Sequence, residues 1–402
     1  MKSRVYSNTI ALVFVQLANY LSPLLVLPFL TRTFGPEGFG ELALIFSIMA
    51  IFLIFTDYGF NIVSPYKIAK RQSDKNYISM YVSNVILAKL FIYLLCGLAL
   101  AVLCLFTNVI EVDLDVYLYV LLGVFFQSIQ LNWFYQGIEK LKILTLATVF
   151  GKVFYLISVM LLVDDSSKSL VVFLYSISFG VSSTVLWFWY FKNGYHFHIK
   201  GWKENVLKEA SEFFISRAFV ALYTSFNTFI IGSQAGYLQA GYYSSAEKIY
   251  QAGQSCSMPI TQAIFPHLSK TKDRKLFLKM FFSVLSLVIF VGLLALYYSN
   301  YIILFLFGHE FLAANSILRI FIIAGMVNFV GSFWGYPAFS LIDRLDVANK
   351  SVMVGGGIHV VVLIYLFLTG NLNALNVVCS VLSVEFIVML IRIFSFYKLR
   401  ER

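Results

Sequence analysis

The sequence predicts an all-α polytopic membrane protein with twelve transmembrane helices, and three observations support this fold class. First, 60% of the 402 residues are hydrophobic and only 12% are charged, an apolar excess that a water-soluble domain does not need. Second, apolar runs long enough to span a bilayer recur along the chain. Third, the polar breaks between these runs alternate in basic charge. The composition disfavours a soluble enzyme, a nucleic-acid-binding domain and a disordered chain, despite a net charge of +10.

The apolar content also limits the number of spans. A transmembrane helix needs roughly 20 mostly apolar residues, so the hydrophobic residues suffice for at most about twelve crossings. The runs reach this number and cover residues 8–30, 39–59, 81–106, 116–134, 143–163, 169–191, 211–232, 239–266, 277–298, 314–336, 349–369 and 374–396. The first run is too long for a signal peptide and lacks a small-residue cleavage site, so we expect it to stay as the first transmembrane helix.

Loop charge tests the twelve spans independently and orients them, because cytoplasmic loops are enriched in Lys and Arg. With the N-terminus in the cytoplasm, the inner segments contain 22 of the 30 Lys and Arg residues, the outer segments contain Arg32 and Lys168, and six lie within spans. The inner segments are residues 1–7, 60–80, 135–142, 192–210, 267–279, 337–350 and the C-terminal tail. The sequence therefore predicts that both termini are cytoplasmic.

The longest basic break divides the chain into two halves of six spans. The expected parts are an N-terminal six-helix bundle in residues 1–191, a cytoplasmic linker in 192–210 and a C-terminal six-helix bundle in 211–402. Apolar residues at helical spacing predict a short amphipathic, interfacial helix at the end of the linker, and these are Trp202, Val206, Ala210 and Phe213.

The two halves share a short repeat at an offset of 201 residues. Gly35 and Gly40 align with Gly236 and Gly241, each pair lying at the break between the first two spans of its half. Repeated halves are typical of many transporters, so the pattern favours a transport function.

Charged residues within spans are costly and are therefore candidates for function. Six of the ten that lie in or at the edge of spans are cations, and they are candidates to bind an anionic head group in a lumen: Lys152, Arg217, Lys89, Lys248, Arg319 and Arg392. Phosphate or pyrophosphate fits this charge, because Lys and Arg bind both by charge-assisted hydrogen bonds. Candidates for ion coupling are the carboxylates Glu385, Asp57 and Glu247.

Structural explanations for these charges remain open. Glu385 and Arg392 are seven residues apart and share a helix face, which suits a structural pair. Lys89, Arg217 and Arg392 lie about a third of the way into their spans from the cytoplasmic side and can extend their charged groups to the interface. Lys152 and Glu385 lie near the centres of their spans, where a charged side chain is farthest from the membrane interface.

Three prolines are candidate hinges. Pro23 and Pro28 lie in the first span and Pro259 in the eighth, and each removes a backbone hydrogen bond and permits a bend. A static kink is the alternative.

Enzymatic patterns are weak. Asp113 and Asp115 match the metal-binding Asp-x-Asp motif of nucleotide-sugar transferases. The predicted topology places them on the non-cytoplasmic side of the membrane, away from cytoplasmic sugar nucleotides. His359 is expected to be a hydrogen-bonded core histidine. The cysteines lie in apolar runs without metal-ligand spacing, which predicts neither disulfides nor a metal site; they are Cys96, Cys104, Cys256 and Cys379. We therefore expect a protein that is not an enzyme.

Several stretches together resemble the Wzx-type O-antigen transporters, polysaccharide-export flippases in the same superfamily as the multidrug and toxin extrusion proteins. The stretches are Leu30-Thr31-Arg32-Thr33-Phe34-Gly35-Pro36-Glu37-Gly38-Phe39-Gly40, Asp57-Tyr58-Gly59-Phe60-Asn61, Ile68-Ala69-Lys70-Arg71, Asn227-Thr228-Phe229-Ile230-Ile231-Gly232, Gly241-Tyr242-Tyr243-Ser244-Ser245-Ala246-Glu247-Lys248-Ile249 and Phe265-Pro266-His267-Leu268-Ser269-Lys270. Their order and spacing extend over nearly the whole chain.

The resemblance implies two six-helix bundles around a central cavity that opens alternately to the two faces of the bacterial inner membrane. It implies transport of undecaprenyl-pyrophosphate-linked oligosaccharide from the cytoplasmic to the periplasmic leaflet. The implied partners are this substrate, membrane lipids and other polysaccharide assembly proteins, with no nucleic acid, and the chain is expected to be a monomer. Asn227 occupies a seventh-span position that is often acidic in the family, which makes it a fourth candidate for ion coupling.

No cofactor is expected, and transport is expected to use proton or sodium coupling or the membrane potential. Two alternatives remain open. One is a cation-coupled multidrug antiporter on the same fold, and the other is a membrane polysaccharide polymerase or glycosyltransferase.

Overall fold

The computed structural model describes residues 2–106, 113–198, 206–211, 213–214 and 226–400, and these residues form helices and connecting turns without a β-strand. The chain divides into two compact units. Unit 1 contains Met1–Phe29 and Leu44–Ala221, and unit 2 contains Leu30–Ala43 and Leu222–Arg402. The all-α prediction is confirmed.

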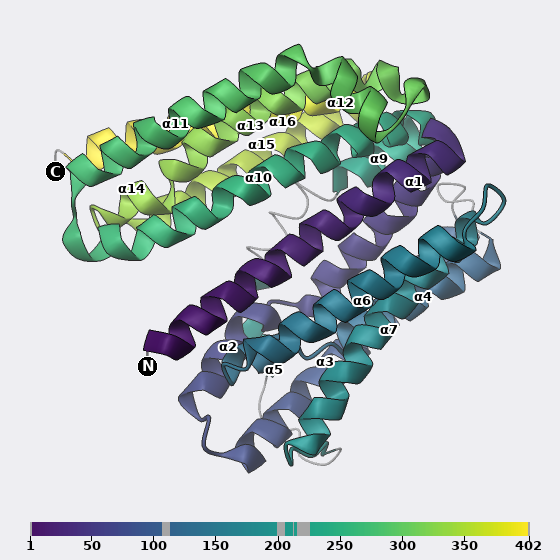
Figure 1. Ribbon diagram of the computed structural model, residues 1–402, viewed down its shortest axis with the longest axis vertical. Helices are drawn as coiled ribbons and strands as arrows, with labels where there is room; N and C mark the ends of the chain where they lie inside the picture. Colours follow the sequence, from purple (N-terminus) through teal and green to yellow (C-terminus); the bar gives the residue numbers. More distant parts are fainter. Residues whose placement is uncertain (1, 107–112, 199–205, 212, 215–225, 401–402) are drawn as a thin grey trace. The chain divides into compact units, whose positions relative to one another are not determined.

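Unit 1 contains both ends of α1 and the next six helices. They are α1 (Lys2–Asp57), α2 (Phe60–Lys70), α3 (Lys75–Phe106), α4 (Leu114–Ser128), α5 (Asn132–Gly137), α6 (Leu141–Leu162) and α7 (Lys168–Lys192). Helices α4 and α6 both pack against α7 (Figure 1).

Unit 2 takes the middle of α1 and the helices from α9 onward. They are α9 (Phe226–Gln234), α10 (Tyr237–Thr271), α11 (Arg274–Tyr297), α12 (Ser299–Leu306), the 3-10 helix η1 (His309–Ala314), α13 (Asn315–Phe333), α14 (Tyr336–Ser340), α15 (Leu345–Leu368) and α16 (Ala374–Arg400). Helix α13 packs against α10, α11 and α16, and α16 also packs against α15 (Figure 1).

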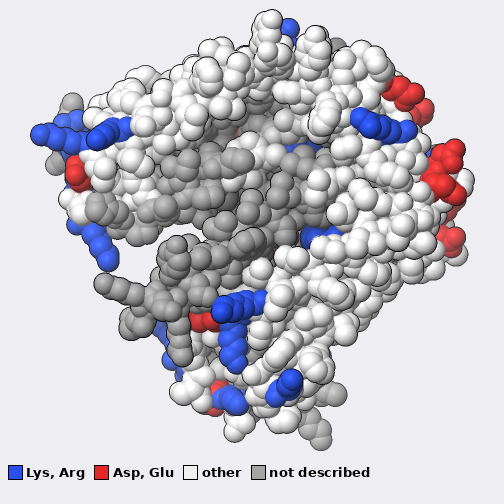
Figure 2. Space-filling model, viewed as in Figure 1, with Lys and Arg blue, Asp and Glu red and all other residues white. Residues whose placement is uncertain are grey.

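Nine segments among the described residues are long and apolar enough to cross a membrane. Uncharged side chains cover most of the helix sides visible in Figure 2. Large apolar side chains such as Leu161 (76% exposed) and Phe305 (77% exposed) face outward, which suits contact with lipid. The chain is therefore a multi-pass membrane protein, whereas the number of twelve spans and the orientation of the termini stay predictions. Helix α10, which contains one of the twelve predicted spans, is not among the nine because many of its residues are polar.

Two predicted spans, 8–30 and 39–59, lie in α1, which consists of two helices joined across a kink. Its backbone is non-helical at Gly35, where φ is +64°. Glycine adopts this left-handed conformation readily because it lacks a Cβ atom. The predicted break between the first two spans is therefore the kink at Gly35 that separates the two helical parts of α1.

The repeated glycines lie face to face in unit 2. A Cβ atom on Gly40 would lie 1.8 Å from the carbonyl oxygen of Tyr237, and a Cβ atom on Gly241 would lie 2.0 Å from that of Pro36. The offset of 201 residues that relates Gly40 to Gly241 also relates Pro36 to Tyr237. The contact is therefore reciprocal, as in an interface with two-fold symmetry. No side chain larger than hydrogen fits at either glycine.

Close helix packing in unit 1 depends on small residues of α7. A Cβ atom on Gly151 of α6 would lie 2.1 Å from the Ser182 hydroxyl, and that hydroxyl donates to the Ala147 carbonyl oxygen at 2.9 Å. Ser176 donates to the Tyr119 carbonyl oxygen of α4 at 2.7 Å. Small residues and hydroxyl hydrogen bonds are the usual means by which membrane helices associate.

The described part of the predicted amphipathic helix, residues 206–211, is helical and packs into the core of unit 1. Val206 and Ala210 are buried with Trp133 and Tyr190, whereas Phe213 is 42% exposed. The apolar residues Val206 and Ala210 of this helix therefore pack against protein. Trp202 lies outside the described residues.

Candidate functional site

The first candidate site is a cluster of one lysine and four aromatic rings in unit 1, which we call the lysine–aromatic cluster. The half-buried Lys152 of α6 places Nζ 5.5 Å from the ring centroid of Tyr175 and 5.3 Å from that of Phe179. The Tyr175 ring contacts Phe46, Tyr155 and Phe179 at centroid distances of 4.7, 5.3 and 4.9 Å. Ring faces attract cations, so the cluster stabilises a positive charge within a predicted span.

The local sequence explains this placement. Tyr175 and Phe179 are four residues apart on α7, so their side chains lie on one face of that helix. Gly151, the neighbour of Lys152, brings α6 close to this helix because a Cβ atom there would lie 2.6 Å from the Ser178 carbonyl oxygen. The glycine and the aromatic pair together place the lysine over two rings.

Two more predicted residues meet in unit 1. Lys89 of α3 is 4% exposed and interacts electrostatically with Asp57, the last residue of α1. The Oδ1 atom of Asp57 is buried and has no hydrogen-bond partner in the described part of the chain. The lysine charge therefore lies buried in unit 1, within electrostatic range of a carboxylate that has acceptor capacity to spare.

The second candidate site is a buried carboxylate network in unit 2. Glu385 of α16, 5% exposed, accepts hydrogen bonds from Asn328 Nδ2 of α13 at 2.9 Å and from the Tyr250 hydroxyl of α10 at 3.2 Å. Gln254 Nε2 donates to the same tyrosine hydroxyl at 2.7 Å. The Asn328, Tyr250 and Gln254 donors are neutral, so the network joins three helices around one carboxylate.

A second chain of hydrogen bonds surrounds His359, which is fully buried. Its Nε2 lies 2.8 Å from Asn227 Oδ1, and its Nδ1 lies 3.0 Å from the Ser380 hydroxyl. Asn227 Nδ2 donates to the Tyr243 hydroxyl at 3.0 Å. Because Asn227 Oδ1 is only an acceptor, Nε2 carries the proton. The prediction of a hydrogen-bonded core histidine is confirmed.

Glu247 lies next to this chain on α10. It is 8% exposed and accepts a hydrogen bond from the Thr228 hydroxyl at 3.3 Å. Since Thr228 follows Asn227, the structure brings two of the ion-coupling candidates into one region of unit 2.

Arg392 binds backbone and hydroxyl acceptors. It is 8% exposed and donates to the Gly331 carbonyl oxygen at 2.7 Å, the Ser351 hydroxyl at 2.8 Å and the Ala348 carbonyl oxygen at 3.4 Å. Glu385, which shares its helix face, makes hydrogen bonds to other partners. In this structure Arg392 joins α13, α15 and α16.

The other predicted residues are scattered. Half-buried Lys248 donates to Gln251 of its own helix at 3.4 Å, and Arg319 is exposed on α13. Arg217 lies outside the described residues. Pro23, Pro28 and Pro259 lie within α1 and α10, which continue through them, so their hinge role stays a prediction. In the described part of the chain, no three His, Cys, Asp or Glu residues lie together as metal ligands would.

Sequence reasoning missed the neutral partners. Tyr175, Tyr250 and Asn328 carry no charge and were not singled out by a search for charged residues within spans. A search for amides in apolar runs finds Asn328, whereas the tyrosines are two among 25.

Comparisons with known proteins agree with this picture. Residues 5–272 match the polysaccharide biosynthesis protein family. The chain is 31% identical over 270 residues to a putative O-antigen transporter of Shigella dysenteriae, covering 65% of this chain and 67% of that one. It is 30% identical over 271 residues to a putative O-antigen transporter of Escherichia coli K12, covering 66% and 65%. The match thus spans about two thirds of these relatives.

Solved structures share the fold at low identity. A MOP superfamily transporter from Pyrococcus furiosus gives a TM-score of 0.67 at 13% identity, covering 99% of this chain and 95% of that one. The lipid II flippase MurJ in an inward closed conformation gives 0.67 at 15% identity, covering 98% and 90%. The family match covers well over half of the chain and the fold agrees, so this membrane protein belongs to the polysaccharide biosynthesis protein family.

Proposed function

We propose that this protein is a flippase that moves undecaprenyl-pyrophosphate-linked O-antigen, or a related polysaccharide repeat unit, from the cytoplasmic to the periplasmic leaflet of the bacterial inner membrane. The observation that carries the proposal is the position of Lys152 over two aromatic rings within a predicted span. This lysine lies in the part of the chain that matches the family. Relatives named putative O-antigen transporters and the fold of a lipid II flippase support the same class of substrate.

The chemistry of the substrate explains why a protein is needed. Each sugar hydroxyl and phosphate oxygen loses hydrogen bonds to water on entering hydrocarbon, at a cost of roughly 2–7 kcal/mol per unpaired polar group. A cation within the membrane replaces part of that hydration by charge-assisted hydrogen bonds to phosphate. The lipid tail of the substrate can remain in the bilayer throughout.

Energy for transport comes from the membrane potential or from an ion. The inside-negative membrane potential drives negative charge outward, and this movement is favourable by about 2.3 kcal/mol per charge per 100 mV. Glu385, Glu247 and Asn227 are the candidates for proton or sodium coupling in unit 2, and Asp57 is the candidate in unit 1. Alternating access and a monomeric state complete the proposal, which requires no cofactor.

The decisive test is transport by Lys152 variants in proteoliposomes. Undecaprenyl-pyrophosphate carrying a fluorescent amino sugar serves as the substrate, and a quencher added outside reports its leaflet. Lys152→Ala should slow flipping by roughly 10- to 100-fold, the loss expected for a hydrogen bond of about 1.5–3 kcal/mol to a charged group. Lys152→Arg should retain part of the rate.

Lys142→Ala is the matched control, because Lys142 lies exposed on the same helix. It should flip at the wild-type rate. Wild-type flipping by Lys152→Ala would contradict the role of the lysine–aromatic cluster.

A cation-coupled multidrug antiporter is the second candidate, and the buried carboxylate network of unit 2 favours it. The same proteoliposomes loaded with a fluorescent amphipathic cation separate the two functions. Export of the cation without movement of the lipid-linked sugar would replace the flippase proposal. Formation of sugar–sugar linkages by the purified protein would instead support a polymerase or glycosyltransferase.

A further inference from the structure

Two lysines converge on one asparagine at an exposed end of unit 1. Lys75, the first residue of α3, donates through Nζ to the Asn193 carbonyl oxygen at 3.0 Å. Lys140, which precedes α6, donates through Nζ to the side-chain oxygen of the same asparagine, also at 3.0 Å. One residue therefore lies between two ammonium groups from different parts of the chain. We call Lys75, Lys140 and Asn193 the two-lysine site.

Both ammonium groups have hydrogen-bond donors to spare. A lysine Nζ carries three N–H donors, and Asn193 supplies one oxygen to each of the two lysines. Both lysines are exposed, and neither forms an ion pair with the described part of the chain. A Cβ atom on Gly194 would lie 3.8 Å from Lys75 Nζ, so the missing side chain leaves this ammonium group open. The two cations can therefore donate further hydrogen bonds to an anion.

The same end of unit 1 carries an excess of positive charge. Residues 60–80, 135–142 and 192–198 contain seven Lys or Arg and two acidic residues, Asp74 and Glu139. Asn193 also ends α7, and the C-terminus of a helix corresponds to only about half a negative charge. Two ammonium groups exceed that partial charge. The two-lysine site is therefore suited to binding an anion.

Aromatic residues of α7 place this end at the membrane surface. Trp189 is 36% exposed and Phe188 is 60% exposed, and Lys192 Nζ lies 4.8 and 5.7 Å from the centroids of these two rings. An exposed tryptophan with a lysine beside it is typical of the layer of lipid head groups. Asn193 follows directly, and its Nδ2 donates to the Trp189 carbonyl oxygen at 2.6 Å. The two-lysine site therefore lies at the level of the head groups.

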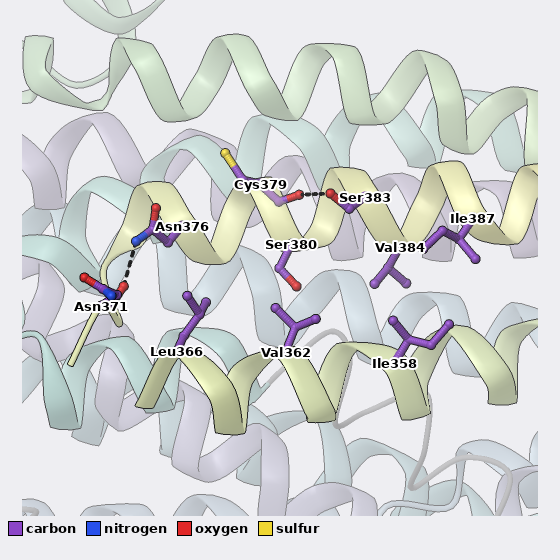
Figure 3. A pocket seen from close by; sticks show the side chains of 10 residues that line it. All are labelled: Ile358, Val362, Leu366, Asn371, Asn376, Cys379, Ser380, Ser383, Val384 and Ile387. Carbon is purple, nitrogen blue, oxygen red and sulfur yellow. Dashed lines mark hydrogen bonds between the residues drawn. The ribbon is translucent and has the colours of Figure 1, made fainter. Parts of the chain in front are cut away.

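The groove between α15 and α16 in unit 2 offers a contrast (Figure 3). It has a volume of about 380 Å³, and the ten residues that line it carry no charge. Two of its polar side chains are bonded within the protein: Asn376 Nδ2 donates to the Asn371 carbonyl oxygen at 2.7 Å, and the Ser383 hydroxyl donates to the Cys379 carbonyl oxygen at 2.9 Å. A phosphate in this groove would lose its hydration without a cation to replace it.

We propose that the two-lysine site binds the phosphate group of an anionic membrane lipid, in the leaflet that the sequence predicts to be cytoplasmic. Both ammonium groups donate to the phosphate oxygens in charge-assisted hydrogen bonds. Basic pockets at the ends of transmembrane helices recognise lipid head groups in this way. The acyl chains lie beside the exposed Phe188 side chain. Such a lipid bridges α3 and the start of α6 at the end of α7, whether or not the protein is a flippase.

Lysine acetylation of the full-length protein in lipid nanodiscs tests this proposal. The nanodiscs contain phosphatidylcholine with or without phosphatidylglycerol, and peptide mass spectrometry measures the rate at which each lysine is acetylated. Phosphatidylglycerol should slow the acetylation of Lys75 and Lys140 about fivefold when its concentration exceeds the Kd about fourfold. The slowing is measured relative to Lys142, which is exposed on the same end of unit 1 and reports the general effect of a negative surface.

Two variants test whether the protection arises in the two-lysine site. Asn193→Asp places a carboxylate between the ammonium groups, which satisfies them within the protein and should abolish the protection. Asn61→Asp adds the same charge at an exposed position of α2 and should keep it. Lys140→Gln removes one of the two cations and should abolish most of the protection of Lys75. Lys70→Gln, at another exposed position of α2, is its matched control.

Inorganic phosphate added to phosphatidylcholine nanodiscs separates a lipid from a free anion. It should give no protection at the same total concentration, because it is not held at the membrane surface. Equal protection by inorganic phosphate would overturn the proposal in favour of a soluble anion. Absence of protection by phosphatidylglycerol, or protection that survives Asn193→Asp, would also overturn it. Val362→Trp fills the groove of unit 2, and loss of the protection in this variant would contradict the assignment to unit 1.

Discussion

The two candidate sites hold charges of opposite sign, a lysine in unit 1 and a carboxylate in unit 2, and they stabilise these charges by different means. In unit 1, Lys152 lies over aromatic rings and Lys89 beside Asp57. In unit 2, Glu385 and Glu247 accept hydrogen bonds from hydroxyl and amide donors. Burial of a charge is tolerated only where partners replace water. This difference is why we propose anion binding for unit 1 and cation or proton binding for unit 2.

Arg392 sharpens this comparison because it is a cation buried in unit 2. Its donors go to two carbonyl oxygens and one hydroxyl on neighbouring helices. A guanidinium engaged in this way holds helices together and has few donors left for a substrate. We therefore expect Arg392 to determine stability and Lys152 to determine transport.

The largest effect is expected for Arg392→Ala. The change removes the Arg392 donor from the Gly331 carbonyl oxygen of α13 and from the Ser351 hydroxyl of α15, and a buried acceptor left without its partner costs about 1–3 kcal/mol. Thermal unfolding in detergent should show a large decrease in Tm. Arg319→Ala, at an exposed position of the adjoining α13, should leave Tm unchanged. A stable Arg392→Ala protein that has lost only transport would break the comparison.

An intermediate effect is expected for Glu385→Gln. The amide keeps an oxygen that accepts from Asn328 or Tyr250, but it cannot ionise, so stability should change by about 1 kcal/mol or less. Dependence of the flipping rate on an imposed proton or sodium gradient should disappear. The exposed carboxylate variant Asp343→Asn serves as control, and retained gradient dependence in Glu385→Gln would exclude Glu385 as the coupling site.

The smallest effect on transport, a partial loss of rate, is expected at Tyr175, whose ring lies next to Lys152 Nζ. Tyr175→Ala removes a cation–π contact of about 0.5–2 kcal/mol, which should slow flipping by roughly 2- to 30-fold. Tyr175→Phe keeps the ring and should flip like the wild type. If the phenylalanine variant is as slow as the alanine variant, the hydroxyl and not the ring face is what matters.

The sequence predicted which charged residues are buried better than it predicted which residues contact them. Lys152, Glu385 and Glu247 stand out because a charge in an apolar run is rare, and all three are wholly or partly buried. Their partners come from other helices: Tyr175 is 23 residues from Lys152, and Tyr250 is 135 residues from Glu385. Side-chain periodicity predicts which residues share one helix face, but it carries no information about which helix packs against that face.

The sequence by itself determined the all-α membrane class and the glycine repeat, because hydrophobic run length and a fixed offset are properties of the chain alone. Only the tertiary structure decided that Gly40 and Gly241 meet reciprocally, that Arg392 binds backbone carbonyls, and that a groove opens between α15 and α16. These features depend on how helix faces pack, since a buried charge acquires its role from the groups that the neighbouring helices bring within a few ångströms.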